Sequence, residues 1–179
     1  MFMLASAAHA EEERRELGPH VHGHGSLMVA IEGNNIQMEF VAPGMDIVGF
    51  EHEADTNRQK RAVEAALADL KEPLNLFELP ESAGCAVTST DVKLVAEEHE
   101  HDHGAAQTES PGEIDDEENH HSEFRATYAL TCEAAEQIKS INFRFFDRFR
   151  DASELSVTFI DADGEAAFGV SRNFRNMER

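Results

Sequence analysis

One stretch of this sequence, Glu97 to His121, has almost nothing with which to build a hydrophobic core. It holds five histidines and ten carboxylates, has no lysine or arginine, and has Ile114 as its single large aliphatic residue. A segment of this composition cannot bury enough apolar surface to offset the entropy of ordering it. We therefore expect a long disordered loop rich in histidine and acid at residues 97–121, inserted into a domain that the rest of the chain must build.

The side chains of this stretch are those that bind divalent transition metals, namely neutral imidazoles and carboxylates. A generic run of charge is more often an acidic solvating loop, in which histidines are incidental. Here the histidines alternate, then pair, and a second HxHxH motif occurs elsewhere in the chain, which favours metal binding. The candidate ligands in the loop are His99, His101, Asp102, His103, His120 and His121.

The length of 179 residues and the 41% hydrophobic content predict one folded domain, over residues 11–179. The formal net charge of -21 argues against nucleic acid and anionic membranes as partners, because both would repel the protein. It favours cations or basic partners, although solubility alone also explains such a charge.

The first ten residues, MFMLASAAHA, resemble the end of a secretory signal peptide, with Ala8-His9-Ala10 as the small-x-small cleavage site. The usual basic segment before the apolar run is missing, so a frayed apolar tail is the alternative. No later run approaches the ~20 apolar residues of a membrane span. We therefore expect a protein exported to an oxidising compartment, where Cys85 and Cys132 would form a disulfide. Two buried thiols, or two soft metal ligands, are the alternatives for these cysteines.

Alternation of apolar and polar residues predicts six or seven mainly antiparallel strands and one firm helix, an α+β fold with the helix covering the sheet. The helix follows a capping box of Thr56 and Gln59, carries an apolar stripe and stops before Pro73. Residues 133–152 are ambiguous between strand and helix, and we favour a strand followed by a short turn. The other predicted strands lie at residues 20–32, 36–41, 85–95, 122–132, 155–161 and 165–171.

Two smaller clusters add candidate metal ligands. His20, His22 and His24 alternate in the first strand and would share one face, ~7 Å apart, close enough for two imidazoles to chelate one ion. A hairpin edge with solvent-facing histidines is the alternative. Glu51 and His52 lie directly before the helix, and His52 would complete a ligand set with His22 and His24 if its loop lay over the first strand.

The HVHG start, the PGMDIVGFEH stretch, the histidine–acid loop, the cysteine late in a tyrosine-containing strand and the closing hairpin together resemble the ZrgA family of periplasmic zinc-binding proteins. The resemblance covers roughly residues 18–174, and HVHG and GFEH are its most specific parts. It implies a zinc-binding protein that assists zinc import beside the solute-binding component of an ABC importer. By position, the metal-associated histidines of the family fall on His20, His22, His52 and the loop set.

The expected function is therefore periplasmic binding and buffering of Zn2+ by an ordered histidine site, with the loop as a weak collector. A zinc-dependent hydrolase is the leading alternative, and a metal-sequestering stress protein without a delivery partner is another. The catalytic alternative lacks motif support: HxHxDH would need other residues at His24 and Gly25, and no HExxH occurs. We expect no enzyme activity.

Overall fold

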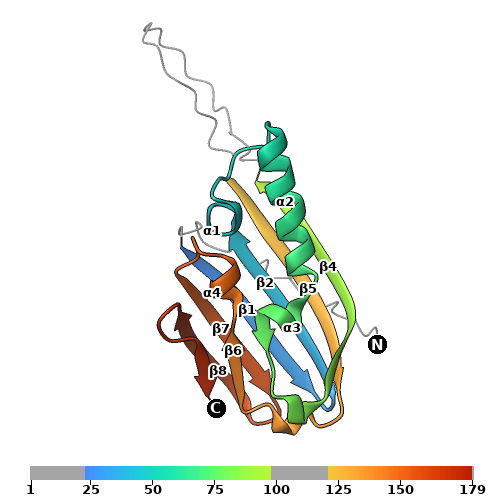
Figure 1. Ribbon diagram of the computed structural model, residues 1–179. Helices are drawn as coiled ribbons and strands as arrows, with labels where there is room; N and C mark the ends of the chain where they lie inside the picture. Colours follow the sequence, from blue (N-terminus) through green and yellow to red (C-terminus); the bar gives the residue numbers. More distant parts are fainter. Residues whose placement is uncertain (1–22, 98–120, 179) are drawn as a thin grey trace, which may run out of the picture.

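The computed structural model describes residues 23–97 and 121–178 and consists of two β-sheets with short helices (Figure 1). The larger sheet has the strand order β4-β5-β2-β1-β7-β8 and the smaller one the order β3-β6-β9. The strands of the larger sheet are β1 His24–Glu32, β2 Asn35–Pro43, β4 Cys85–Glu97, β5 His121–Cys132, β7 Glu154–Asp161 and β8 Gly164–Ser171. Those of the smaller sheet are β3 Phe77–Glu78, β6 Ser140–Phe143 and β9 Asn176–Glu178.

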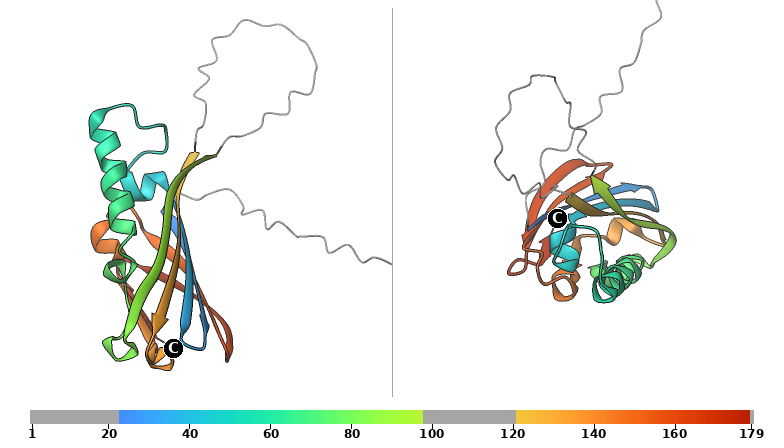
Figure 2. Two further views of the ribbon diagram at one scale, coloured as in Figure 1. Left: turned by 90° about the vertical axis from the view of Figure 1, so that its right-hand side faces the viewer. Right: turned by 90° about the horizontal axis from the view of Figure 1, so that it is seen from above.

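Helices lie on one face of the larger sheet, as the edge-on view in Figure 2 shows. They are α1 Gly44–Val48, α2 Asn57–Leu70, α3 Pro73–Leu76 and α4 Phe145–Arg148, with 3-10 turns at Glu81–Ala83 and Ala135–Gln137. The sequence predicted α2 alone, so the helical layer is richer than expected. The other three helices have four or five residues each, too few to produce a recognisable apolar period. No helix in the described residues is long and apolar enough to cross a membrane.

Alternating residues of the larger sheet face the helices and form the core. In β1 and β2 the inward set includes Leu27, Val29, Ile36, Met38 and Phe40, all almost fully buried, whereas their chain neighbours are more exposed. The two strands pair in register from Ser26 with Val41 to Glu32 with Asn35, and a turn at Gly33 and Asn34 joins them. The predicted strand periodicity is thus confirmed here.

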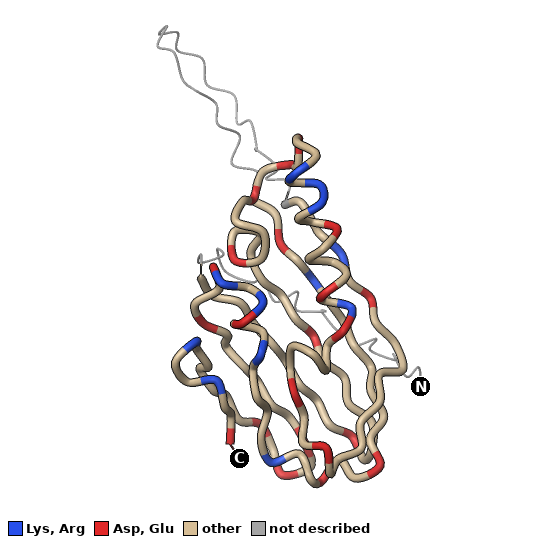
Figure 3. Tube along the Cα trace, in the orientation of Figure 1, with Lys and Arg blue, Asp and Glu red and all other residues tan. Residues whose placement is uncertain are grey.

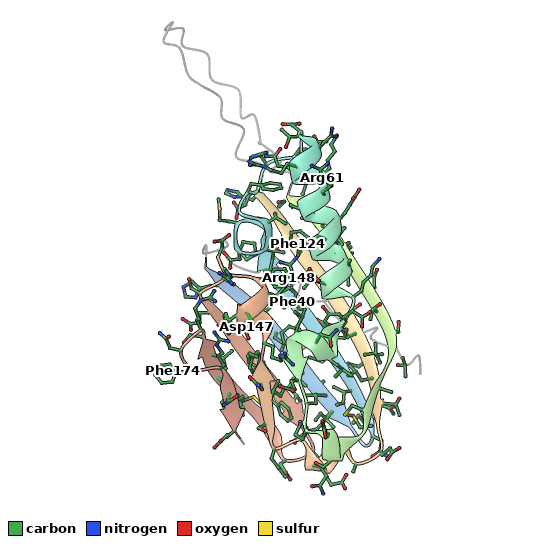
Figure 4. The ribbon with its side chains drawn as sticks, viewed as in Figure 1. Phe40, Arg61, Phe124, Asp147, Arg148 and Phe174 are labelled. Atoms are coloured by element: carbon green, nitrogen blue, oxygen red, sulfur yellow. A yellow bond between two sulfur atoms is a disulfide. The ribbon has the colours of Figure 1, made fainter. Side chains whose placement is uncertain are left out.

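Phenylalanines fill the space between the two sheets. The Phe40 ring lies 5.9 Å from that of Phe77 and 5.4 Å from that of Phe145, centroid to centroid. The Phe143 ring lies 6.0 Å from that of Phe77, and the Phe149 ring lies 5.1 Å from that of Phe145, so both extend the same cluster. The labelled Phe40 and Phe124 lie under the helical layer in Figure 4. Residues 133–152 supply three of these rings through β6, α4 and the turn after it, so the favoured strand is confirmed and the turn is a short helix.

Helix α2 begins as predicted. The Gln59 backbone N–H donates to the Thr56 hydroxyl at 3.2 Å, and the Thr56 N–H donates to the Gln59 side-chain oxygen at 3.0 Å. This reciprocal pair is the capping box expected from the sequence. Ala66 and Leu70 are buried at the core, with Val63 and Leu67 packed beside them.

Strands β4 and β5 pair antiparallel from Cys85 with Cys132 to Glu97 with His121. The predicted disulfide between Cys85 and Cys132 is present and joins the two strands at one end. The predicted insertion point of the acidic loop is at the other end, where Glu97 and His121 face each other. The loop residues 98–120 and the expected leader at residues 1–10 lie outside the described part of the chain.

The expectation of a mainly antiparallel sheet holds for every pairing in the larger sheet except that of β1 with β7, which run parallel. His24 faces Glu154 and Ala30 faces Ile160 in this pair. The larger sheet is therefore mixed, because the chain crosses back through the smaller sheet and α4 before β7 enters beside β1. The β7–β8 hairpin that follows is the predicted one.

Candidate metal site

The predicted ligands that the structure describes lie at one end of the larger sheet. Strands β1, β5 and β7 begin at this end, and β2 and β4 finish there, since Pro43 faces Glu123 and His24 faces Glu154. His121 opens β5, His24 opens β1, and Glu51 and His52 follow the short helix α1 that leaves β2. We call this the histidine end; it is the upper end of the sheet in Figure 1.

The histidine end is tied together through Gly23, the residue just after His22. The Gly23 N–H donates to the carboxylate of Asp46 at 2.7 Å, and Asp46 is buried within α1. The Gly23 carbonyl accepts from the backbone N–H groups of Ser153 at 3.2 Å and Glu154 at 2.8 Å. The HVHG and PGMDIVGFEH motifs, distant in sequence, are therefore in direct contact. With φ of +86°, Gly23 also has a backbone conformation that favours glycine.

Helix α1 lies close against the start of β5. A Cβ atom added to Gly44 would lie 2.5 Å from the Ser122 hydroxyl and 2.7 Å from the Phe50 carbonyl, closer than real Cβ atoms come. Only glycine therefore fits at position 44 without a shift of backbone. This close approach brings the residues after α1 beside those at the beginning of β5.

Two of the predicted ligands, Glu51 and His121, are in direct contact. The Nδ1 atom of His121 lies 2.7 Å from a carboxylate oxygen of Glu51, whose side chain is 10% exposed. An ionised carboxylate only accepts, so Nδ1 carries the hydrogen and the neutral ring has its lone pair at Nε2. This is the arrangement in which a carboxylate orients a metal-binding histidine.

His52 is exposed and held by its neighbours. Its ring stacks on that of Phe50, with centroids 5.1 Å apart. Nδ1 donates to the Glu53 carbonyl at 2.7 Å, and Nε2 accepts from the Gln59 amide at 3.3 Å. A metal at Nε2 would have to displace this long amide contact.

His24 faces a carboxylate across the parallel strand pair. Its Nδ1 lies 3.8 Å from Glu154, and both side chains are nearly half exposed. A contact of this length and exposure gives little energy even when the imidazole is charged. Across residues 23–97 and 121–178, no three side chains of His, Cys, Asp or Glu lie close enough together to hold one metal ion. The predicted set of His52 with His22 and His24 includes His22, which lies outside these residues.

Most predicted ligands lie outside the described residues. These are His20, His22, His99, His101, Asp102, His103 and His120. The full ligand set therefore stays a prediction, while Glu51, His121, His24 and His52 have the surroundings given above.

Two carboxylates of the histidine end, Asp46 and Glu123, were not among the ligands predicted from the sequence. Asp46 lies inside the apolar run MDIV, and an acid in such a run is a signal of a specific buried role. Glu123 lies two residues after His121, is 1% exposed, and accepts from the Nε of Arg125. Glu123 and Arg125 are two residues apart and therefore lie on one face of the strand.

The fold and these side chains define a class: an α+β domain with imidazoles and carboxylates gathered at one end of its main sheet. The chain belongs to the ZrgA family of zinc uptake proteins, whose family model matches residues 19–178. The match covers nearly the whole chain and confirms the resemblance seen in the sequence. The family is one of zinc uptake and is not a known enzyme family. No curated protein matches the chain significantly.

Proposed function

We propose that this protein binds Zn2+ in the periplasm and assists its import, with the histidine end as its ordered binding site. Family membership supports the role in zinc uptake. The observation that carries the site is the convergence of sequence-distant ligand candidates at one end of the sheet, with His121 oriented by Glu51. Imidazole nitrogen and carboxylate oxygen are both common zinc ligands.

In this proposal His121 binds zinc through Nε2, and Glu51 acts as a positioning residue rather than as a ligand. The sequence alone placed Glu51 among the ligands. The 2.7 Å contact favours the positioning role, because the carboxylate already accepts from Nδ1. His20 and His22 immediately precede the anchored Gly23, so they are the proposed partners of His121 at the site.

The histidines and acids of residues 98–120 form the second part of the proposal. They start and end at Glu97 and His121, so the ions that they bind are held close to the histidine end. Tethered weak ligands raise the local concentration of an ion at a neighbouring site. We propose that this segment collects zinc and passes it to the ordered site.

Delivery to an importer is the last step of the proposal. A solute-binding component of a zinc ABC importer is the proposed acceptor, consistent with the uptake role of the family. The Cys85–Cys132 disulfide suits a periplasmic location, because disulfides persist in oxidising compartments. Zinc transfer from the loaded protein to the purified acceptor, followed with a zinc-sensitive dye, tests this step.

Zinc titration against a competing chromogenic chelator tests the site itself. We expect His121→Ala to weaken the tightest zinc by tenfold or more and Glu51→Gln to weaken it by roughly 10 to 100-fold, the usual effect of removing a carboxylate that orients a ligand. Glu136→Gln, an exposed acid outside the histidine end, is the control and should leave affinity unchanged. Unchanged tight binding in His121→Ala protein that is still folded would contradict the proposed site.

A further inference from the structure

A second charged site lies between α4 and the turn that joins β8 to β9. Asp147, Arg150, Arg172 and Arg175 line a surface pocket of about 420 Å³ there. In Figure 3 basic residues gather around this turn and α4, and Asp147 and Phe174 are labelled in the same part of Figure 4. None of these residues belongs to the candidate metal site.

The three arginines leave this pocket with excess positive charge. Arg172 donates to the backbone carbonyls of Phe146, Phe149, Arg150 and Ala152, which satisfy hydrogen-bond donors but carry no net charge. Arg175 pairs with Asp147, the single acid of the lining. Arg150 is exposed and has no ion-pair partner within the described residues. Three positive charges thus face one negative charge.

This local excess is unusual in a chain of formal net charge -21. Exposed charges more than about 8 Å apart are largely screened at physiological salt, so the distant acids do not cancel the field within the pocket. Guanidinium groups bind carboxylates through paired N–H donors in a planar fork. Arg175 already pairs with one carboxylate of the pocket, that of Asp147, through a single N–H donor.

We propose that this arginine pocket binds anions that carry two or more carboxylates. The pocket volume lies in the usual range for small-ligand sites, roughly 300 to 1,000 Å³. Asp147 within the lining favours separated carboxylates over a compact, doubly charged phosphate, because the single acid repels a concentrated charge more strongly. The carboxylates come either from a small polycarboxylate or from an acidic peptide segment.

Phe174 distinguishes the two sources. It lies between Arg172 and Arg175 in the same turn and is 75% exposed, the highest exposure among the large hydrophobic residues described. Arginine and phenylalanine are both enriched where protein partners bind. A peptide segment would cover Phe174 as well as the arginines, whereas a small anion would contact the arginines alone.

Isothermal titration calorimetry of the metal-free full chain at low ionic strength tests the proposal, with citrate, hexaglutamate and inorganic phosphate as probes. We expect citrate or hexaglutamate to bind more tightly than phosphate, and added salt to weaken the binding. Arg150→Gln with Arg175→Gln should lower this affinity at least tenfold. The control variant, Lys71→Gln with Lys139→Gln, removes the same amount of charge at exposed positions outside the pocket. It should change the affinity for the anion less than twofold.

The single variant Arg150→Gln should fold normally, because Arg150 has no ion pair among the described residues to lose. We expect it to weaken anion binding at least threefold. A further loss of hexaglutamate binding in Phe174→Ser assigns the site to a peptide segment, and citrate binding that Phe174→Ser leaves unchanged assigns it to a small polycarboxylate. Absence of binding, equal loss in the lysine control, or phosphate binding as tight as that of citrate would overturn the proposal. Tight zinc binding should be unchanged in every one of these variants, so this result is independent of the zinc site.

Discussion

At the scale of single residues, Arg172 shows how one side chain organises a segment that has little regular structure. Its guanidinium accepts no hydrogen bond but donates to four carbonyls within residues 146–152, and it lies 6.0 Å from the Phe146 ring. The next residues, Ser153 and Glu154, bind the Gly23 carbonyl. Arg172 therefore supports the histidine end from a distance.

Arg172→Met should lower the free energy of unfolding by about 2 to 4 kcal/mol. Hydrogen bonds from a charged donor contribute roughly 1.5 to 3 kcal/mol each, and losses within one group do not add fully. Arg144→Met is the matched control, since Arg144 is 60% exposed and its ion pair with Glu78 is long, at 4.0 Å; we expect a change within about 0.5 kcal/mol. Urea denaturation of both variants measures this, and equal effects would contradict the role of Arg172.

Tyr128 offers a direct probe of the core because it is the only tyrosine in the chain. It is 1% exposed, its hydroxyl has no hydrogen-bond partner in the described structure, and burial raises the pKa of the phenol above its ordinary value. The folded state thus keeps its proton where the unfolded state loses it. The resulting stability is fully present below the unfolded pKa of ~10 and is lost as the pH rises above it.

We therefore expect the tyrosinate absorbance of the native protein to stay absent at pH 10 to 11 and to appear only together with unfolding. Protein in denaturant, the control, should titrate near pH 10. A native protein that titrates in the same range as the denatured one would place the phenol in contact with water.

At the scale of elements, the strands whose alternation is complete were predictable. Leu27 and Val29 in β1, and Ile36, Met38 and Phe40 in β2, report their buried face directly in the sequence. Strand β9 was not predicted, because it has three residues and only Met177 is buried. The parallel pairing of β1 with β7 is likewise invisible locally, since it depends on how distant segments pack.

The same limit applies to the candidate site. The sequence made His121, His52 and Glu51 candidates, but the pairing of His121 with Glu51 and of His52 with Gln59 came from geometry. The contact of Asp46 with Gly23 joins a side chain to a backbone group, and backbone groups leave no signal in a sequence.

The β4–β5 hairpin should fold without residues 98–120. Glu97 faces His121 just as Glu32 faces Asn35 in the β1–β2 hairpin, which a two-residue turn closes. Replacing residues 98–120 by Asn-Gly keeps His121 and should raise stability by up to about 2 kcal/mol, because a shorter loop costs less entropy to close. Zinc capacity should fall while the tightest affinity persists.

Calorimetric zinc titration and thermal denaturation measure both effects of this replacement. A second protein, in which the histidines of residues 98–120 become asparagine at full loop length, separates loop length from ligand content. Loss of the tightest zinc binding in either protein would mean that residues 98–120 supply ligands of the tight site, which would contradict the proposal.

At the scale of the whole molecule, histidine ligation should make zinc binding depend on pH. Imidazole must be neutral to bind zinc, and its ordinary pKa is ~6.5, so each ligating histidine should cost roughly 25-fold in affinity between pH 7 and pH 5. Carboxylate ligands would keep most of their affinity over that range. Competition titrations at both values, with the pH dependence of the chelator corrected, would refute histidine ligation if the affinity stayed constant.

The parallel pairing of β1 with β7 also has a consequence for the order in which the protein folds. β1 can pair with β2 early, because a turn of two residues joins them. Its pairing with β7 needs Glu154 and its neighbours, which are distant in sequence. Contacts between distant segments form slowly, since a large loop must close first. The Gly23 contacts with Ser153 and Glu154 belong to this slow class, so the capacity to hold zinc should develop after most of the secondary structure. Stopped-flow refolding, followed in parallel by circular dichroism and by a zinc-sensitive dye, would resolve the two events.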